Sequence, residues 1–316
     1  MATVSPTRRM LPDRLTLLAF AGVVFIAGAN IVAVRFANGD MEPFFGAGFR
    51  FAIAGLLLLA VAAFRKASIP TRQELIGTVL YGLLAFGGAM ALGYWALVRL
   101  PAAVGGVIIA SVPVLTLFLA RLHRLEPFRW RGLVGGLLTV AGIAVLVGGS
   151  LEGSVPVGSA LAMLGGALCL AEAGVVVKRF PLCHPMVSNG LAMAIGAALL
   201  LGVSLAANET WSLPTRPTVW FALGFVVLIG SVALFAMYLH VLNGWTASGA
   251  SYQFVLIPFV AALLGAVLLD ESISAGFVLG GLIVLAGVYV GALSSGKTPI
   301  PSTPEHEAHA QRCSTT

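Results

Sequence analysis

Long runs of apolar residues, separated by short polar segments, make up most of the 316-residue chain. A helix needs roughly 20 apolar residues to cross the hydrocarbon core of a membrane. Ten runs approach that length, at residues 15–35, 44–64, 75–97, 102–120, 132–148, 157–177, 186–207, 218–239, 246–269 and 273–293. The pattern predicts an all-α integral membrane protein with ten transmembrane helices.

The polar segments are either short links or terminal tails. The whole link between the third and fourth runs is ValArgLeuPro at 98–101, so neighbouring helices are expected to run antiparallel. Residues 1–14 and 294–316 are polar and rich in Pro, Ser and Thr, a composition typical of disordered tails. No segment remains for a soluble catalytic domain, and the spanning length of the first run argues against a cleaved signal peptide.

The two halves of the chain repeat each other. A shift of 145 residues aligns residues 113–142 with 258–287, and a shift of 142 aligns residues 43–59 with 185–201. The predicted repeats, 15–149 and 157–293, contain five apolar runs each. Because five is an odd number, the second repeat starts on the opposite side of the membrane. The sequence therefore predicts two inverted five-helix repeats, which is a recurrent plan of transporters.

Glycines recur at matched positions in the last helix of each repeat. Gly135 and Gly142 are seven residues apart, as are Gly280 and Gly287, so each pair lies on one face of its helix. Small residues on one face allow a neighbouring backbone to approach closely. No phosphate-binding or dinucleotide-binding fingerprint surrounds these glycines, so we assign them to helix packing.

Composition excludes a water-soluble globule, because 59% of the residues are hydrophobic and only 9% are charged. The net charge of +6 could suggest nucleic acid. With the N-terminus inside, however, the outer segments contain only Arg35, Arg99 and Arg216 of the 18 Lys and Arg. This asymmetry follows the positive-inside rule and predicts two cytoplasmic termini and no nucleic-acid partner. The three cysteines lack the spacing of a disulfide framework or a metal site.

Four segments carry a resemblance to a known family: GANIVAVRF at 28–36, MEPFFGAGFRFAIAGLLLL at 41–59, YWALVRLPAAVGGVIIASVPVLTLFLA at 94–120 and LLDESISAGFVLGGLIVLAGVYVG at 268–291. They resemble the EamA family of the drug/metabolite transporter superfamily, and the likeness extends from about Leu15 to Leu293. The resemblance implies ten helices in two inverted halves and export of amino acids or other small metabolites. Two features depart from the family. The first helix lacks its usual central aromatic residue, and Leu125 replaces the glycine that usually precedes the glutamate at Glu126.

Two charged residues, Arg50 and Glu172, lie clearly inside apolar runs. A charge there costs at least roughly 2.5 kcal/mol, so both are candidate translocation residues. Arg50 lies roughly 9 Å below the outer end of its run. It is either an anchor that snorkels outward or the partner of an anionic group.

Glu172 lies in LAEAGVVVK at 170–178. This segment resembles the first helix of small multidrug resistance proteins, in which such a glutamate binds protons and cationic substrates. Desolvation would allow this carboxylate to exchange a proton near neutral pH. The alternative is a protonated glutamic acid that is hydrogen-bonded to a neighbouring helix.

Other candidates are polar or helix-breaking residues within the runs. Asn30, at roughly the place of Glu172 in the first half, either joins helices or contacts substrate. Pro113 and Pro258 are expected to kink the fourth and ninth helices, and interrupted helices often line transporter cavities. Candidate contacts near these prolines are Ser111, Ser251, Tyr252 and Gln253. The alternative is that these side chains turn toward other helices.

Several residues near helix ends have two interpretations. His240 is either a proton carrier or an interfacial residue. Tyr94 either lines the pathway or belongs to an interfacial aromatic belt. Glu126 and Glu271 occupy matched positions at helix starts, where a carboxylate favours the helix dipole, and we interpret both as caps.

These features predict a secondary-active transporter of the inner membrane. We expect it to export an amino acid or a similar small metabolite by alternating access, coupled to protons. A proton-coupled efflux pump for multidrug cations is the alternative. An intramembrane enzyme is disfavoured, because the runs contain no aspartate and the nearest Ser/His combination, Ser248 and His240, lacks a protease context. The expected partners are a small-molecule substrate and membrane lipid, without a cofactor or metal, in a monomer or homodimer.

Overall fold

The computed structural model describes residues 12–37, 40–97, 99, 108–109, 111–126, 130–147, 156–180, 184–269 and 275–293, and all regular structure in these residues is helical. This confirms the predicted all-α class. The first half contains α1 (Arg14–Ala37), α2 (Pro43–Phe64), α3 (Arg72–Tyr81), η1 (Gly82–Gly88), α4 (Ala89–Leu97), α6 (Val112–Leu122) and α7 (Trp130–Val147). The second half contains α8 (Val157–Arg179), α9 (Pro185–Ala206), α10 (Pro217–Val227), η2 (Leu228–Ala233), α11 (Leu234–Gly244), α12 (Ala247–Ser251), α13 (Gln253–Leu269), α14 (Ala275–Val288) and η3 (Tyr289–Leu293). The predicted cap Glu271 lies outside the described residues, as do most of the predicted tails.

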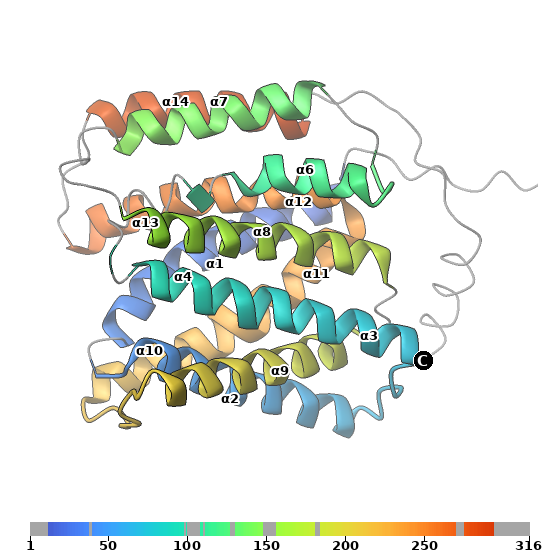
Figure 1. Cartoon of the computed structure of the whole chain (residues 1–316), viewed down its shortest axis with the longest axis vertical. Coiled ribbons are helices and arrows are strands. Elements are labelled where there is room, and N and C mark those ends of the chain that lie inside the picture. Colours follow the sequence, from blue (N-terminus) through green and yellow to red (C-terminus); the bar gives the residue numbers. More distant parts are fainter. Residues whose placement is uncertain are drawn as a thin grey trace, which may run out of the picture.

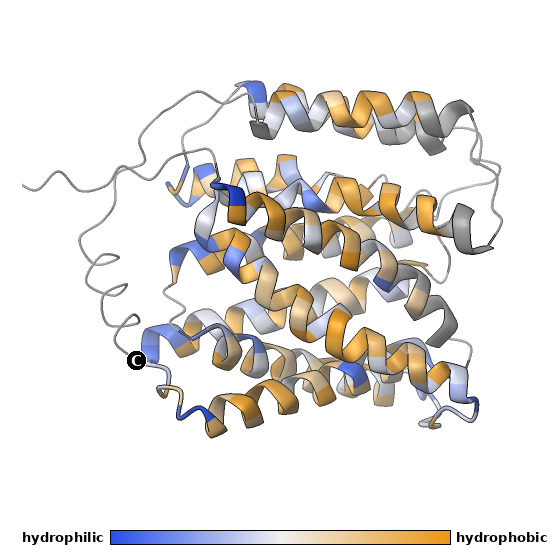
Figure 2. Cartoon of the chain, turned by 180° about the vertical axis from the view of Figure 1, so that it is seen from behind, coloured by the Kyte–Doolittle hydropathy of each residue, from blue (hydrophilic) through white to orange (hydrophobic). Residues whose placement is uncertain are grey.

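Many of these helices have the length and composition of membrane spans. Five are long and apolar enough to cross a membrane, namely Pro43–Phe64, Arg72–Leu97, Val157–Arg179, Pro185–Ala206 and Pro217–Gly244. Hydrophobic residues extend along the helices, while hydrophilic residues gather toward helix ends and links (Figure 2). Large apolar side chains such as Leu56 and Phe221 are exposed, as lipid-facing residues would be.

Local sequence explains where several helices begin. Proline occupies the first turn of α2, α9 and α10, where its missing N–H is not needed by the helix. At the start of α3, Glu74 N donates to Thr71 Oγ1 at 3.4 Å and Thr71 N donates to the Glu74 carboxylate at 2.5 Å. This capping box satisfies two of the N–H groups that the first turn leaves free.

Equivalent helices of the two halves pack directly against each other. The α7–α14 pair forms one of the two most extensive interfaces, and these helices lie side by side in Figure 1. A Cβ added to Gly135 would lie 2.6 Å from the Gly287 carbonyl oxygen, and one added to Gly142 would lie 2.9 Å from that of Gly280. Residue numbers rise along α7 as they fall along α14, so the pair is antiparallel. The packing role predicted for these glycines is confirmed.

The α2–α9 pair, also side by side in Figure 1, forms the other extensive interface. A Cβ on Gly55 would lie 2.9 Å from the Gly190 carbonyl oxygen, and one on Gly48 would lie 2.9 Å from the Leu201 side chain. These contacts again show an antiparallel crossing. The first helix of each half packs against helices of the other half. α1 packs against α10, α11 and α13, and α8 packs against α3, α4 and α6.

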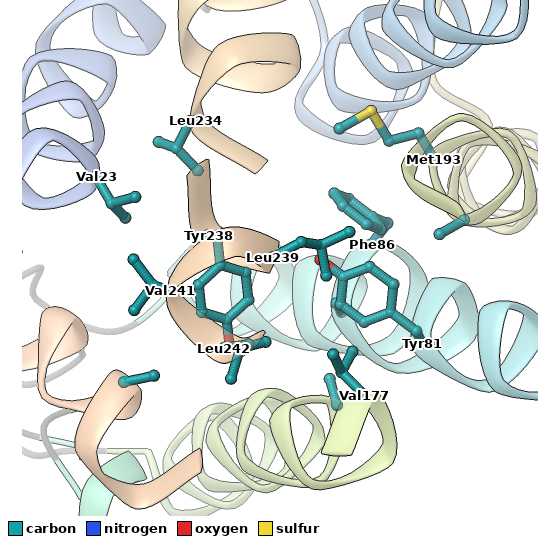
Figure 3. Packing of buried hydrophobic residues seen from close by; sticks show 14 of the residues in the cluster. Val23, Tyr81, Phe86, Val177, Met193, Leu234, Tyr238, Leu239, Val241 and Leu242 are labelled. Atoms are coloured by element: carbon teal, nitrogen blue, oxygen red, sulfur yellow. The ribbon is translucent and has the colours of Figure 1, made fainter. Parts of the chain in front are cut away.

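The hydrophobic core lies between the halves. In Figure 3, Val23, Tyr81 and Phe86 of the first half surround the same space as Met193, Tyr238 and Leu239 of the second. All six side chains are buried. The core therefore depends on both halves together.

A π-helical turn interrupts the third helix of each half, which the sequence analysis did not predict. The first is η1, between α3 and α4, and the second is η2, between α10 and α11. The shift of 145 residues places η1 on residues 227–233, nearly the same as η2. Such turns weaken the regular backbone hydrogen bonding and often occur at functional sites.

The fourth and ninth predicted spans leave regular helix at Ser111 and at Tyr252, ahead of their prolines. Pro113 lies in the first turn of α6, which begins at Val112, and so stands at a helix start where we expected a bend in a continuous helix. In the ninth span, α12 and α13 separate at Tyr252, and Pro258 lies within α13.

Candidate functional site

Arg50 is buried between the two halves, with 8% of the residue exposed. Its Nε donates to Ser231 Oγ at 2.9 Å, and its guanidinium carbon lies 4.5 Å from the centroid of the Phe51 ring. Ser231 Oγ in turn donates to the Val226 carbonyl oxygen at 2.9 Å. Within the described residues, no carboxylate forms an ion pair with Arg50. Because a guanidinium carries five N–H donors, this arrangement leaves a buried positive charge that can bind an anionic group.

Asn30 reaches the same π-helical turn from α1. Its Nδ2 donates to the Gly230 carbonyl oxygen at 3.3 Å, and its Oδ1 is buried without a hydrogen-bond partner in the described part of the chain. A Cβ at Gly230 would overlap Asn30 Oδ1, so a larger residue there would displace the Asn30 side chain. Neighbouring residues of η2 thus hold Asn30 and Arg50, both from the other half. Together these two side chains offer a positive charge and an unpaired acceptor.

A series of aromatic rings adjoins Arg50 and links the two π-helical turns. The Phe51 and Phe86 centroids are 5.0 Å apart, and Phe86 is 4.5 Å from Phe235. Phe235 lies 6.4 Å from Tyr238. Phe86 belongs to η1 and Phe235 directly follows η2, so the rings connect the irregular turns of both halves. Edge-to-face pairs of this kind contribute about 0.5–1.5 kcal/mol each beyond burial.

Glu172 on α8 forms an ion pair with His123 at the end of α6. The Oε1–Nε2 distance is 3.1 Å, and 25% of the Glu172 side chain and 28% of the His123 side chain are exposed. Glu172 Oε2 is buried and lacks a hydrogen-bond partner among the residues the structure describes. The pair joins the first half to the second. Sequence analysis identified Glu172 but missed His123, because no spacing rule connects residues so far apart in the chain.

Two of the candidates at the broken spans donate hydrogen bonds to backbone carbonyl groups, one nearby in the chain and one in the other half. Ser111 Oγ donates to the Ile108 carbonyl oxygen at 2.6 Å, and Tyr252 Oη donates to that of Gly132 at 3.4 Å. Gln253 is 3% exposed, and its Oε1 has no hydrogen-bond partner in the described residues. Of these three, Gln253 is the one that presents an unused acceptor.

Tyr94 and His240 lie in different surroundings. Tyr94 is half-buried, and its ring lies edge-on to that of Phe44 at 6.4 Å. His240 is exposed on α11, near the start of α1. There, hydrogen bonds from Thr16 hold the pKa of Asp13 below its ordinary value, and the nearby His240 adds to this effect.

Glu126 is a cap, but it caps a different helix from the one we expected. Its carboxylate accepts hydrogen bonds from the Ser248 hydroxyl and, at 3.3 Å, from Ser248 N in the first turn of α12. The side chain therefore serves the second half and not the helix that follows it in the chain. Ser248, which had been considered with His240 as a remote protease-like pair, is engaged by this carboxylate. No group of three or more His, Cys, Asp or Glu in the described residues could hold a metal ion.

The link between α9 and α10 fastens onto the start of α2. The Glu209 carboxylate accepts hydrogen bonds from Phe44 N at 3.1 Å and Phe45 N at 2.8 Å, which caps α2. Arg216 Nε donates to Asp40 Oδ1 at 2.9 Å. This hydrogen bond is the main reason that the pKa of Asp40 lies below its ordinary value. We call the Asp40–Arg216 pair the outer clamp.

Comparisons with known proteins agree with this architecture. The model of the EamA-like transporter family matches twice, over residues 14–148 and 158–292. The chain is 32% identical to the "Uncharacterized inner membrane transporter YedA" of Escherichia coli K12, with 91% of this chain and 94% of that protein aligned. It is 25% identical to the "Uncharacterized transporter YyaM" of Bacillus subtilis, with 89% and 93% aligned. A solved crystal structure with 19% identity and a TM-score of 0.75 covers 88% of this chain and 96% of its own, and so shares the fold.

The double match follows the internal repeat, and the similarity to the bacterial relatives extends over nearly the whole chain. The helical architecture and its apolar spans are those of a multi-pass membrane protein. The chain belongs to the EamA-like transporter family.

Proposed function

We propose that the protein is a secondary-active transporter that exports an amino acid or a similar small metabolite by alternating access, coupled to protons. In this proposal ten transmembrane helices form two inverted repeats, with both termini in the cytoplasm. The antiparallel crossings of α2 with α9 and of α7 with α14 support it, since equivalent helices of inverted repeats must run in opposite directions. The name of the Escherichia coli relative supports an inner-membrane location.

The observation that carries the substrate assignment is the buried guanidinium of Arg50. It lies between the halves, bonded to Ser231 and without a carboxylate partner in the described residues. Burying an unpaired charge is costly, and an anionic ligand would offset that cost. Asn30 bonds to Gly230, the η2 residue next to Ser231, and its own Oδ1 is unpaired in the described residues. That oxygen can accept a hydrogen bond from an amino group. A carboxylate and an amino group on one small molecule match these two side chains.

Multidrug cation efflux is the second candidate, and Glu172 favours it. Its Oε2 is buried and has no hydrogen-bond partner among the described residues, so it could bind a proton or a cation. Two observations weigh against it. Arg50 would repel a cation between the halves, and Glu172 Oε1 already has His123 as its partner.

Two measurements test the proposal. The first is a metabolite profile of medium from cells that overproduce the protein, in which we expect an amino acid to accumulate. The second is efflux of a radiolabelled amino-acid mixture from proteoliposomes. We expect Arg50→Met to lower that efflux at least about tenfold, equivalent to about 1.4 kcal/mol.

The matched control is Arg65→Met, at the exposed end of the same helix, which should transport normally. Normal efflux by Arg50→Met would contradict the substrate site. Loss of amino-acid efflux together with intact efflux of a lipophilic cation would favour the second candidate.

A further inference from the structure

The ends of α6 and α8 meet across the boundary between the two halves. Two small buried clusters pack these helices together, one around Val112 with Ala167 and Ala171, the other around Ala120 with Val175. The second cluster also contains Ala247 of α12, and Leu125 packs against it. His123 lies just after α6, where its N donates to the Leu119 carbonyl oxygen at 2.9 Å. The predicted topology puts this end of the interface at the cytoplasmic surface. The His123–Glu172 pair joins the two halves at this end of the interface.

We propose that His123 is a positioning residue that closes the cytoplasmic end of the transport path by holding Glu172. The His123–Glu172 pair, which we call the inner latch, must separate before substrate enters from the cytoplasm. This inference rests on the proposed transport function. The two clusters that pack α6 against α8 are apolar, whereas the pair joins a carboxylate to an imidazole, so it is a specific bond that resists opening.

Protonation controls the strength of the inner latch. The attraction is greatest when His123 is charged and Glu172 is ionised, and a histidine changes charge near neutral pH. A proton on Glu172, or the loss of one from His123, removes the charge attraction. The unpaired Oε2 gives a proton a place to bind while Oε1 remains at His123.

Other ionisable groups belong to the elements that pack around α8. They are Arg121 and Arg124 at the end of α6, Glu126 beside α12, Arg72, Glu74 and Tyr81 on α3, Tyr94 on α4, Tyr238 and His240 on α11, and Lys178 and Arg179 on α8 itself. In the described part of the chain, none of them forms an ion pair with Glu172.

Cys169 provides a reporter that does not depend on transport. It is three residues before Glu172 on α8 and so one turn deeper, with its Sγ beside Gly88 at the end of η1. Its thiol is half-buried. With Cys183→Ser and Cys313→Ser it becomes the sole cysteine, and its reaction with a membrane-impermeant maleimide can be followed in vesicles that expose the cytoplasmic face. Each rate is divided by that of the same thiol in the unfolded chain at the same pH.

We expect His123→Ala and Glu172→Gln to speed this labelling by about fivefold, the effect of losing a partly exposed ion pair of about 1 kcal/mol. His123→Lys keeps a positive charge, so its labelling should stay slow at about pH 6 and about pH 8 alike. His240→Ala is the matched control, because it removes an exposed histidine that has no contact with Glu172 in the structure, and it should leave the rate unchanged.

Equal labelling of all these variants would overturn the inner latch, as would an increase in His240→Ala that matches His123→Ala. Proteoliposome efflux of the radiolabelled amino-acid mixture separates this result from the proposed function. If the wild type moves no amino acid while labelling responds as expected, the latch stands and the substrate proposal fails. If the wild type transports and labelling does not respond, the latch alone fails.

Discussion

The π-helical turns η1 and η2 occupy matched positions in the two halves but are stabilised by different kinds of contact. Around η1 the contacts are apolar and close: a Cβ on Gly82 would lie 2.7 Å from the Ala192 carbonyl oxygen, and one on Gly196 would lie 2.8 Å from the Phe86 carbonyl carbon. Around η2 the contacts are polar, since Asn30 bonds to Gly230 and Arg50 bonds to Ser231. One turn is fixed by backbone packing, and the other is held by hydrogen bonds that a ligand can replace.

The shift of 142 residues makes this difference specific, because it places Arg50 on Ala192. A duplicated position has thus become a buried arginine in one half and a fully buried alanine in the other. The comparison teaches that the two repeats share a scaffold but differ in their side chains, with polar contacts at η2 and close packing at η1. Four substitutions test this conclusion, described here from the largest expected effect to the smallest.

Placing an arginine at Ala192, the position equivalent to Arg50, should destabilise the protein most. In Ala192→Arg the new side chain would meet the close packing at η1, with Phe86 where η2 has Ser231. A buried charge without a partner costs about 3–5 kcal/mol, so we expect loss of folded protein. Yield and thermal unfolding in detergent measure this. The control is Ala206→Arg, at the exposed end of the same helix, and a stable Ala192→Arg protein would show that η1 is as open as η2.

Adding one methyl group at η1 should have the next largest effect. A Cβ on Gly196 overlaps the Phe86 side chain, whereas one on Gly202, in the same helix, meets nothing within 4 Å. We expect Gly196→Ala to lower the free energy of unfolding by about 1–3 kcal/mol, as overpacking does. Gly202→Ala should be neutral or slightly stabilising. Equal melting temperatures for the two variants would contradict the close packing.

Removing the acceptor at η2 should cost less. Ser231→Ala deletes the hydroxyl that binds Arg50 Nε, and one hydrogen bond contributes about 1 kcal/mol. A double-mutant cycle with Arg50→Met isolates the pair, and we expect a coupling energy of about 1 kcal/mol in thermal or denaturant unfolding. A coupling of zero would mean that the bond between the halves does not stabilise the fold.

The outer clamp should give the smallest effect, because it is exposed. Asp40 precedes α2, which carries Arg50, and Arg216 precedes α10, which leads to η2. The pKa of Asp40 is lowered on folding, so the clamp stabilises the protein above the ordinary aspartate pKa of about 3.9 and is lost as the pH falls through the folded value. The protection of residues 207–216 against hydrogen exchange, relative to the unfolded chain at the same pH, should thus be constant at pH values well above 4. In acid the wild type should lose protection and approach Asp40→Asn. A variant that exchanges like the wild type under all conditions would show that the clamp has no effect.

The helical class and the positions of the apolar spans could be predicted from the sequence, because helices that cross a membrane appear as apolar runs of about 20 residues. The packing role of Gly135 and Gly142 could be predicted as well, since small residues on one face of a membrane helix allow close approach. That α7 and α14 cross each other at these glycines was not predicted. Arg50 and Glu172 stood out because charge is rare in apolar runs. Their roles in transport remain predictions.

What the sequence did not reveal depends on contacts between the halves. His123 lies among arginines at a helix end, and nothing in its neighbours indicates a partner on α8. Glu126 lies between two helices in the chain, so its hydrogen bond to the start of α12 could not be predicted from its neighbours. The π-helical turns have no local signature beyond scattered glycines. Pro113 fits both a kink and a helix start, and only the surrounding fold decides between them.

The glycine crossing of α7 with α14 has a consequence for how this chain can evolve. Because Gly135 lies against Gly287 and Gly142 against Gly280, the main chain of each copy excludes side chains from the other. The two copies have diverged elsewhere, as Arg50 and Ala192 show. At this crossing, however, a larger residue in one copy would collide with the backbone of the other. The duplicated gene can specialise its two ends only around a junction that both must keep.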